Sequence, residues 1–136
     1  MSGTTNLHGV ALCGDMKNRP FRERVAFAIT GIVTVWRREP SFRTQLRLAG
    51  LGVAILLALR PGWLWAAVLL SSAVLVLALE MANAALEYLA DQVHPDIAPG
   101  IAAAKDAAAG AVLLASGGAL ATATLMLADR AYSFFS

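Results

Sequence analysis

The sequence predicts an all-α integral membrane protein, with three transmembrane helices that follow an N-terminal amphipathic surface helix. Of its 136 residues, 58% are hydrophobic and only 15% are charged, and the mean hydropathy is +0.64. A soluble globular domain usually has a charged fraction of about a quarter. Three apolar runs, residues 48–59, 61–79 and 107–128, contain no charged residue. We therefore expect a single membrane domain over residues 20–136.

The segment before that domain, residues 1–19, is expected to be a disordered tail. It lacks the basic start and the long apolar run of a secretory signal peptide. Its one cysteine, Cys13, has no second cysteine with which to form an intramolecular disulfide. The net charge of +2 is too small to indicate a nucleic-acid partner.

Residues 20–38 predict the surface helix. Apolar residues recur there at helical spacing, while charged and hydroxyl residues occupy the complementary positions: Phe21, Val25, Ala28, Ile32 and Val35 against Arg22, Glu23, Thr30 and Thr34. The segment is too mixed to cross a bilayer, and a basic face opposite Phe and Trp is typical of a helix in the headgroup plane. A helix that packs in a soluble domain is the alternative. Pro40 ends the helix, because proline disfavours helical backbone in the residue before it.

The first span is predicted over residues 42–60. The apolar run 48–59 has only twelve residues, about 18 Å at 1.5 Å per residue, which is shorter than the ~30 Å hydrocarbon core. Phe42 and Leu46 extend its apolar face backwards, and the arginines at its ends, Arg43, Arg47 and Arg60, can snorkel to the headgroups. The extended segment is long enough to span.

The second span, residues 62–91, follows a tight turn at Arg60, Pro61 and Gly62. Trp63 and Trp65 fit an interfacial aromatic belt. The helix is expected to continue beyond the bilayer as a cytoplasmic extension, since no Gly or Pro interrupts it before Asp91.

The third span, residues 101–129, is expected after a loop over residues 92–100, which contains two prolines and a glycine. Its charge-free run of twenty-two residues is long enough to cross the bilayer. Gly110, Gly117 and Gly118 are predicted to allow close approach of a neighbouring helix.

The distribution of basic residues predicts the orientation of the three spans. Eight of the eleven Lys and Arg residues lie between Lys17 and Arg47. By the positive-inside rule this places the N-terminus in the cytoplasm, the turn at Arg60 outside, and the end of the second span in the cytoplasm again. Glu39 and the polar end of the second helix then meet on the side that holds nucleoside triphosphates.

Four polar residues form an acidic face on the end of the second helix. Glu80, Asn83, Glu87 and Asp91 are offset by three, seven and eleven positions, which places them within about 80° of arc on a helix. His94 continues this spacing but stands before Pro95, so we interpret it as part of the loop. Carboxylates at a membrane boundary are costly unless they are paired, and they often mark ion or metal sites.

These residue types are suited to phosphoryl transfer. Mg²⁺ takes oxygen ligands, usually one or two carboxylates with phosphate oxygens, and Glu39 and Glu87 could supply them. Glu80 could position or deprotonate a hydroxyl, and Lys105 could offset phosphate charge. The sequence has no GxxxxGK[ST] loop, no GxGxxG and no HRD-like loop. The soluble kinase classes are therefore unsupported.

Two separated motifs resemble the prokaryotic membrane diacylglycerol kinase and undecaprenol kinase family. They are ExxNxAxExxxD over residues 80–91 and AKDxAAGAVL over residues 104–113. The upstream segment 31–43, with Trp36 and the E-x-x-F-R of Glu39, Phe42 and Arg43, is similar too. The resemblance covers about Phe21 to the end of the chain, with compatible spacing between the motifs.

The resemblance implies a homotrimer in the bacterial cytoplasmic (inner) membrane that uses ATP and Mg²⁺ to phosphorylate a lipid alcohol. Glu80 aligns with the family's general base, and Glu39 and Glu87 align with the carboxylates that hold the metal ions bridging the ATP phosphates. Besides these two carboxylates, the resemblance assigns four residues to the ATP site: Asn83, Asp91, Lys105 and Asp106.

The lipid would be framed by Phe42, Arg43 and Gln45 beside Glu80, together with the surface helix. Gln45 departs from the acidic residue of some members, and Ser41 stands where Asn is common. These differences leave open whether diacylglycerol or undecaprenol is the substrate.

Two non-enzymatic functions are the alternatives. A small membrane subunit could bind an ion or conduct protons through Glu80 alone, and a structural helper could bind lipids without chemistry. Neither alternative requires Glu39, Glu87 and Lys105 together.

Overall fold

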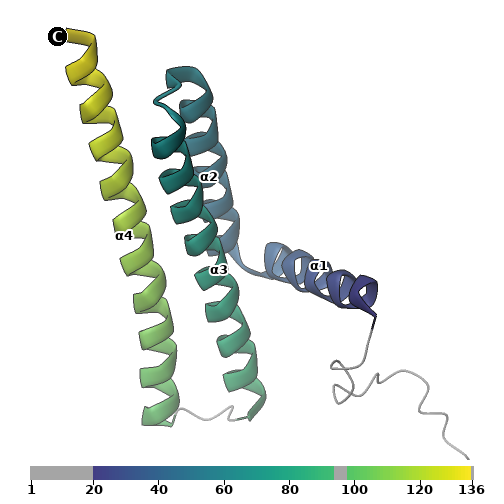
Figure 1. Ribbon diagram of the computed structural model, residues 1–136. Helices are drawn as coiled ribbons and strands as arrows, with labels where there is room; N and C mark the ends of the chain where they lie inside the picture. Colours follow the sequence, from purple (N-terminus) through teal and green to yellow (C-terminus); the bar gives the residue numbers. More distant parts are fainter. Residues whose placement is uncertain (1–19, 94–97, 136) are drawn as a thin grey trace, which may run out of the picture. The chain divides into compact units, whose positions relative to one another are not determined.

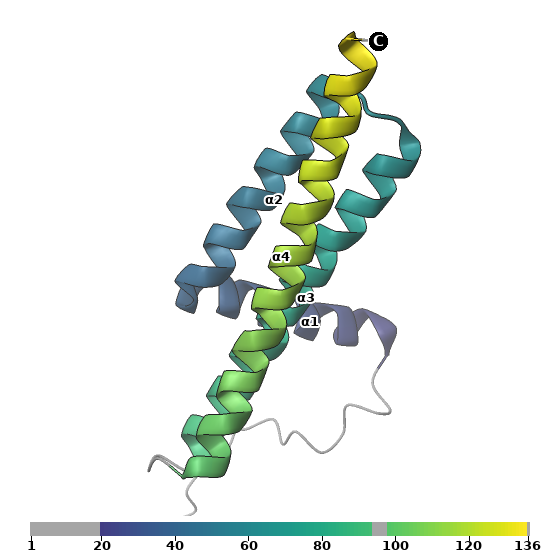
Figure 2. The same ribbon diagram turned by 90° about the vertical axis from the view of Figure 1, so that its left-hand side faces the viewer.

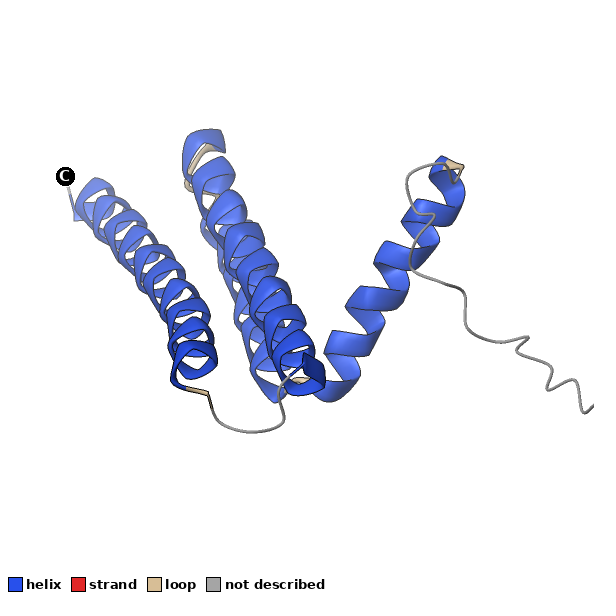
Figure 3. Ribbon diagram, turned by 90° about the horizontal axis from the view of Figure 1, so that it is seen from below, coloured by secondary structure: helices blue, strands red, loops and turns tan. Residues whose placement is uncertain are grey.

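The computed structural model of the protein describes residues 20–93 and 98–135, and nearly all of them are helical (Figure 1). The four helices are α1 (Phe21–Arg38), α2 (Pro40–Leu59), α3 (Trp63–Val93) and α4 (Pro99–Phe135). The described residues contain no strand, as Figure 3 shows. The predicted tail 1–19 and His94 lie outside the described residues.

The chain divides within α1 into two units, residues 1–33 and 34–136. The first unit contributes most of α1, whose large apolar side chains are exposed, as in Phe21 at 77% and Ile29 at 55%. That α1 lies in the headgroup plane stays a prediction. The second unit contains the end of α1 and the other three helices.

The described residues contain three helices of the length and composition predicted for membrane spans. α2, α3 and α4 are each long and apolar enough to cross a bilayer, with hydropathies of 1.4, 2.1 and 1.8 over their most apolar windows. Only 11% of each of those windows is buried within the chain. Most of the apolar surface of the three helices is therefore available to lipid or to another protein chain.

The junction of α1 and α2 follows from Pro40. The residue before it, Glu39, has extended backbone, with φ −103° and ψ 108°. Proline is tolerated in the first turn of a helix, where its missing N–H would have no helical partner, so α2 begins at Pro40 itself. Glu39 is thus the single non-helical residue between two helices.

The turn between α2 and α3 uses two residues with positive φ. Arg60 closes α2 in the left-handed conformation, at φ 45°, and its N–H donates to the Leu56 carbonyl at 2.9 Å. Gly62, at φ 102°, occupies a region that favours glycine because it lacks a Cβ. The tight turn predicted from Arg60, Pro61 and Gly62 has this physical basis.

The connection between α3 and α4 is shorter than the predicted loop 92–100. Gln92 and Val93 continue α3, and Pro99 and Gly100 already belong to α4. The loop prediction took Pro99 as a helix breaker, but at the first helical position proline costs no hydrogen bond. The Ala98 carbonyl accepts from the N–H groups of Ile101 and Ala102, at 3.0 and 3.1 Å.

The α4 helix also continues beyond residue 129, to Phe135. Asp129 and Arg130 end the apolar run without ending the helix, because neither residue prevents backbone hydrogen bonding. The three glycines expected to allow close helix approach do not do so within one chain. A Cβ added at Gly110, Gly117 or Gly118 would meet nothing within 4 Å.

α3 packs most extensively on α4 and less on α2. Figure 2 shows α4 running alongside α3. Polar contacts join α3 and α4 near both ends of their packed region. Lys105 bonds Asp91 at 2.9 Å, and the Trp65 indole N–H donates to the Asp129 carboxylate at 3.1 Å. The two helices are therefore held antiparallel in a defined register.

A small buried cluster joins the end of α1, the start of α2 and the middle of α3. Val35, Phe42 and Ala84 form its centre, with exposures of 5%, 5% and 2%. Three partly buried side chains of α3 pack against them: Leu77, Met81 and Tyr88. The cluster lies beside the polar residues of α3 and supports them.

We predict that Phe42→Ala destabilises the protein, because it empties the centre of this cluster. The expected loss is on the order of 3 kcal/mol, measured by SDS titration of the protein in mixed micelles. Phe134→Ala is the matched control, since Phe134 is 84% exposed. Equal effects of the two substitutions would contradict the assignment of Phe42 to the core.

Candidate functional site

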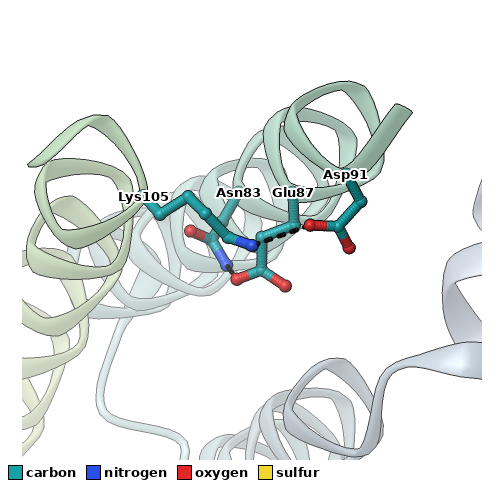
Figure 4. Close-up of polar contacts among 4 residues, drawn as sticks. All are labelled: Asn83, Glu87, Asp91 and Lys105. Carbon is teal, nitrogen blue, oxygen red and sulfur yellow. Dashed lines mark hydrogen bonds and ion pairs between the residues drawn. The ribbon is translucent and has the colours of Figure 1, made fainter. Parts of the chain in front are cut away.

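The four residues of the acidic face lie on one uninterrupted helix, α3. Figure 4 shows Asn83, Glu87 and Asp91 projecting from the same side of that helix, with Lys105 reaching toward them from α4. Spacings of three, four and four residues along an α-helix bring side chains to a common face. The structure therefore places the sequence-predicted residues of α3 in one row.

Glu80 begins this row and is 6% exposed. It is the one buried polar or charged residue in the described part of the chain. The Ser41 hydroxyl of α2 donates to Glu80 Oε2 at 3.1 Å. Ser41 therefore supplies the hydrogen bond that a buried carboxylate needs.

Glu39 reaches the same region from the junction of α1 and α2. The Tyr88 hydroxyl, on α3, donates to Glu39 Oε1 at 2.7 Å. The guanidinium carbon of Arg38 lies 5.8 Å from the centre of the Tyr88 ring, within range of a cation–π contact. Two hydroxyl groups thus cross between α2 and α3 in opposite directions, each to a carboxylate that the sequence predicted to be functional.

Asn83 and Glu87 are joined within α3. The Asn83 side-chain N–H donates to Glu87 Oε1 at 2.9 Å. The carbonyl oxygen of the same amide is buried and has no hydrogen-bond partner among the described residues. A buried amide oxygen without a partner is uncommon and indicates a place for a ligand, water or ion.

Lys105 brings α4 to the acidic face. Its ammonium lies 2.9 Å from Asp91 Oδ1, and the side chains are 36% and 67% exposed. An ion pair this exposed adds little stability, so its main effect is to set where the cation lies. Asp106 is exposed on α4 beside Lys105.

The residues expected to frame a lipid have different environments. Phe42 lies in the buried cluster and presents little surface within one chain. Arg43 is half-buried. Gln45 donates from its side-chain nitrogen to the Ser116 hydroxyl of α4 at 3.2 Å, which links α2 with α4.

Three residues that contact the predicted site were missed from the sequence: Ser41 as the partner of Glu80, Tyr88 as the partner of Glu39, and Ser116 as the partner of Gln45. A partly buried tyrosine hydroxyl usually finds a hydrogen-bond partner. The position of Tyr88 directly after Glu87 could therefore have indicated that it contacts a residue of the site. Which carboxylate or amide each hydroxyl contacts depends on how α2 packs on α3 and α4, and the spacing of residues in the sequence does not determine that packing.

The oxygen-rich set around Glu87 fits a Mg²⁺ ion with phosphate oxygens. No group of three or more His, Cys, Asp or Glu side chains gathers in residues 20–93 and 98–135. Mg²⁺ does not require one, since it commonly takes one or two carboxylates and completes its octahedron with waters and substrate phosphates. The unpartnered Asn83 oxygen beside Glu87 is a further donor of the preferred kind.

The helices and the site together define a class of protein: a small helical membrane protein in which the carboxylates of α3 and Lys105 of α4 lie at the same end of the apolar helices. The sequence model of the family described as prokaryotic diacylglycerol kinase matches residues 26–127. The chain belongs to that family, as its motifs indicated, and its three apolar helices accord with an inner-membrane protein. Searches of curated proteins and of solved structures gave no significant match.

We predict that Ser41→Ala lowers the free energy of unfolding by about 1–2 kcal/mol, because the buried Glu80 carboxylate loses its donor. Thr44→Ala is the matched control on α2. The Thr44 hydroxyl is exposed and donates only to the Pro40 carbonyl of its own helix. SDS titration of both variants measures the difference, and no difference would show that the Ser41 contact is energetically unimportant.

Proposed function

We propose that the protein is a lipid kinase that transfers the γ-phosphoryl group of Mg·ATP to the hydroxyl of a membrane lipid alcohol. The alcohol is diacylglycerol, which gives phosphatidic acid, or undecaprenol, which gives undecaprenyl phosphate. The observation that carries the proposal is the family match over residues 26–127, which contains every proposed site residue. The burial of Glu80 and the grouping of oxygen donors along α3 support it.

Glu80 is proposed as the general base. One carboxylate oxygen, Oε2, accepts from Ser41, which leaves Oε1 to accept the proton of the lipid hydroxyl. The deprotonating hydroxyl oxygen attacks the γ-phosphorus, and the bond from that phosphorus to the β,γ-bridging oxygen breaks, releasing ADP. Burial suits this role, because exclusion of water protects the transfer from hydrolysis.

Glu39 and Glu87 are proposed to hold Mg²⁺, and Asn83 to support them. A bound Mg²⁺ would offset the charge on the ATP phosphates and orient them. Glu39 has one oxygen committed to Tyr88, and Glu87 has one committed to Asn83. Each carboxylate therefore keeps a second oxygen for a cation.

Lys105, Asp91 and Asp106 are proposed to complete the ATP site. The Lys105 ammonium lies 2.9 Å from Asp91 Oδ1. The exposed ion pair with Asp91 is weak. A terminal phosphate oxygen of ATP carries more negative charge than a carboxylate oxygen, so Lys105 can exchange Asp91 for the phosphates at a small cost in free energy. Asp91 thus holds the lysine close to where it is needed.

Lipid selection is proposed for the start of α2, with Arg43 and Gln45 near the headgroup region and Phe42 behind them. The amide of Gln45 is neutral where some relatives have an acid, and it is held by Ser116. This supports a substrate whose reactive end is uncharged and carries one free hydroxyl, a feature that both candidate lipids share.

The orientation with a cytoplasmic N-terminus and the homotrimer are also proposed. The arginine-rich segment before α2 supports the orientation. The low burial of the spans, 11% of each apolar window, supports assembly with further copies, as does the open space around the Cβ positions of Gly110, Gly117 and Gly118.

Label transfer is the experiment that tests the function. Purified protein in lipid bicelles is given Mg²⁺ and γ-labelled ATP with diacylglycerol, with undecaprenol, or with no added alcohol. Label should enter one of the lipids. Folded protein that labels neither lipid would exclude the kinase, and proton or cation flux in vesicles would then favour the ion-binding alternative at Glu80.

We predict that Glu80→Gln lowers the turnover rate by about a hundredfold or more and leaves ATP binding largely intact. The amide keeps the shape of the carboxylate and can still accept from Ser41, but it cannot take the proton. Initial rates and equilibrium binding of a fluorescent ATP analogue measure the two effects. Loss of nucleotide binding would instead place Glu80 in the metal site.

We predict that Glu87→Gln raises the Mg²⁺ concentration needed for half-maximal activity, by about tenfold or more, or eliminates activity. A neutral amide is a weaker ligand for a hard cation. Asp129→Asn is the control, because that carboxylate lies near the opposite end of α4 and bonds Trp65. An unchanged Mg²⁺ dependence in Glu87→Gln would contradict its role as a ligand.

A further inference from the structure

Glu39 occupies an unusual position for a residue that must present its carboxylate accurately. It is the single residue between α1 and α2, and its backbone bonds both helices: its N–H donates to the Val35 carbonyl at 2.8 Å, and its carbonyl accepts from the Arg43 N–H at 3.4 Å. As the residue that precedes α2 it could cap that helix, but its side chain makes no capping hydrogen bond. Its orientation must therefore be fixed by another group.

That group is Tyr88. Its hydroxyl donates to Glu39 Oε1 at 2.7 Å, which is a short contact of the charge-assisted kind. Tyr88 is itself well held, because it lies on the continuous helix α3 and packs against the buried cluster of Val35, Phe42 and Ala84. Arg38 over the ring adds a second constraint. A donor on a continuous helix thus meets the carboxylate of the one residue that lies between two helices.

Tyr88 directly follows Glu87 on α3, and its hydroxyl bonds Glu39. Two carboxylates that approach a common site repel each other before a cation arrives. A hydroxyl donor beside them holds one carboxylate in place without adding charge. It also occupies one oxygen of Glu39, so that only the other oxygen is presented to a cation.

We propose that Tyr88 is a positioning residue that orients Glu39 for binding of a divalent cation together with Glu87. This inference rests on the proposed function, because it takes Glu39 and Glu87 as the metal ligands. It adds a residue at a position that the ExxNxAxExxxD motif leaves unspecified, and it assigns Glu39 a single free oxygen. Tyr88 acts through Glu39 and does not contact the reacting atoms.

Tyr88→Phe tests the proposal, because it removes the hydroxyl and keeps the ring that packs on the cluster and faces Arg38. We expect the Mg²⁺ concentration for half-maximal activity to rise about tenfold, in the range found when the partner of a metal ligand is lost. The kcat at saturating Mg²⁺ should stay close to that of the wild type. Tyr132→Phe is the matched control, since Tyr132 is 76% exposed near the end of α4.

Binding of Mn²⁺ gives a readout independent of turnover. Electron paramagnetic resonance measures free Mn²⁺ in the presence of protein and a non-hydrolysable ATP analogue. Tyr88→Phe should weaken Mn²⁺ binding by a similar factor in the native chain, and should have no further effect in a Glu39→Gln background. This second comparison separates a role through Glu39 from a general loss of packing.

The outcomes distinguish the inference from the function on which it rests. If the wild type transfers label and Tyr88→Phe leaves Mg²⁺ and Mn²⁺ dependence unchanged, the inference is wrong and the lipid kinase stands. A reduced kcat at every Mg²⁺ concentration, with unchanged Mn²⁺ binding, also overturns it and leaves Tyr88 a packing residue. If the wild type labels no lipid, the kinase itself fails.

Discussion

The arrangement of this protein depends on one constraint, which is that a carboxylate near the hydrocarbon core must have a hydrogen-bond donor or a cation. Four of the predicted site carboxylates have one, and in each case the donor belongs to a different residue type: Ser41 for Glu80, Tyr88 for Glu39, Asn83 for Glu87 and Lys105 for Asp91. Three of these four contacts cross between segments. Satisfying the carboxylates therefore also positions the start of α2 and the start of α4 against α3.

This coupling means that the site and the helix packing are not separate features. The buried cluster around Phe42 lies next to Ser41 on α2 and includes Tyr88 on α3. Apolar packing alone would specify position weakly in a membrane, because lipid tails compete for the same surfaces. The hydrogen bonds from hydroxyl groups to carboxylates depend on geometry, so they fix the relative position of the helices more closely than apolar contacts do.

Much of the architecture could be predicted from the sequence because it depends on local or periodic properties. The three spans follow from charge-free runs, and the single row of Glu80, Asn83, Glu87 and Asp91 follows from helix geometry. The break at Glu39 follows from Pro40. The family could be identified from two motifs, which the match over residues 26–127 confirms.

The errors and omissions have equally physical causes. Pro99 was taken to continue a loop, although proline at a first helical position is compatible with a helix start. The glycines of α4 meet no neighbouring helix within one chain, so the prediction that they allow close helix approach stays a prediction for contacts between chains. Ser41 and Tyr88 were missed as partners because a hydroxyl can bond any carboxylate within reach. Only the packing of α2 on α3 decides which carboxylate that is.

The unequal lengths of the helices give the acidic face a gradient of depth. At 1.5 Å per residue, the 20 residues of α2 measure about 30 Å, the thickness of the hydrocarbon core, whereas the 31 residues of α3 measure about 46 Å. Counted from Trp63, Glu80 lies about 26 Å along α3 and Asp91 about 42 Å. With Trp63 at one surface of the hydrocarbon core, as its predicted interfacial position requires, Glu80 falls within the core and Asp91 falls beyond its far surface. In this placement a lipid in the hydrocarbon core can reach the Glu80 end of the row, while a water-soluble molecule can reach the Asp91 end.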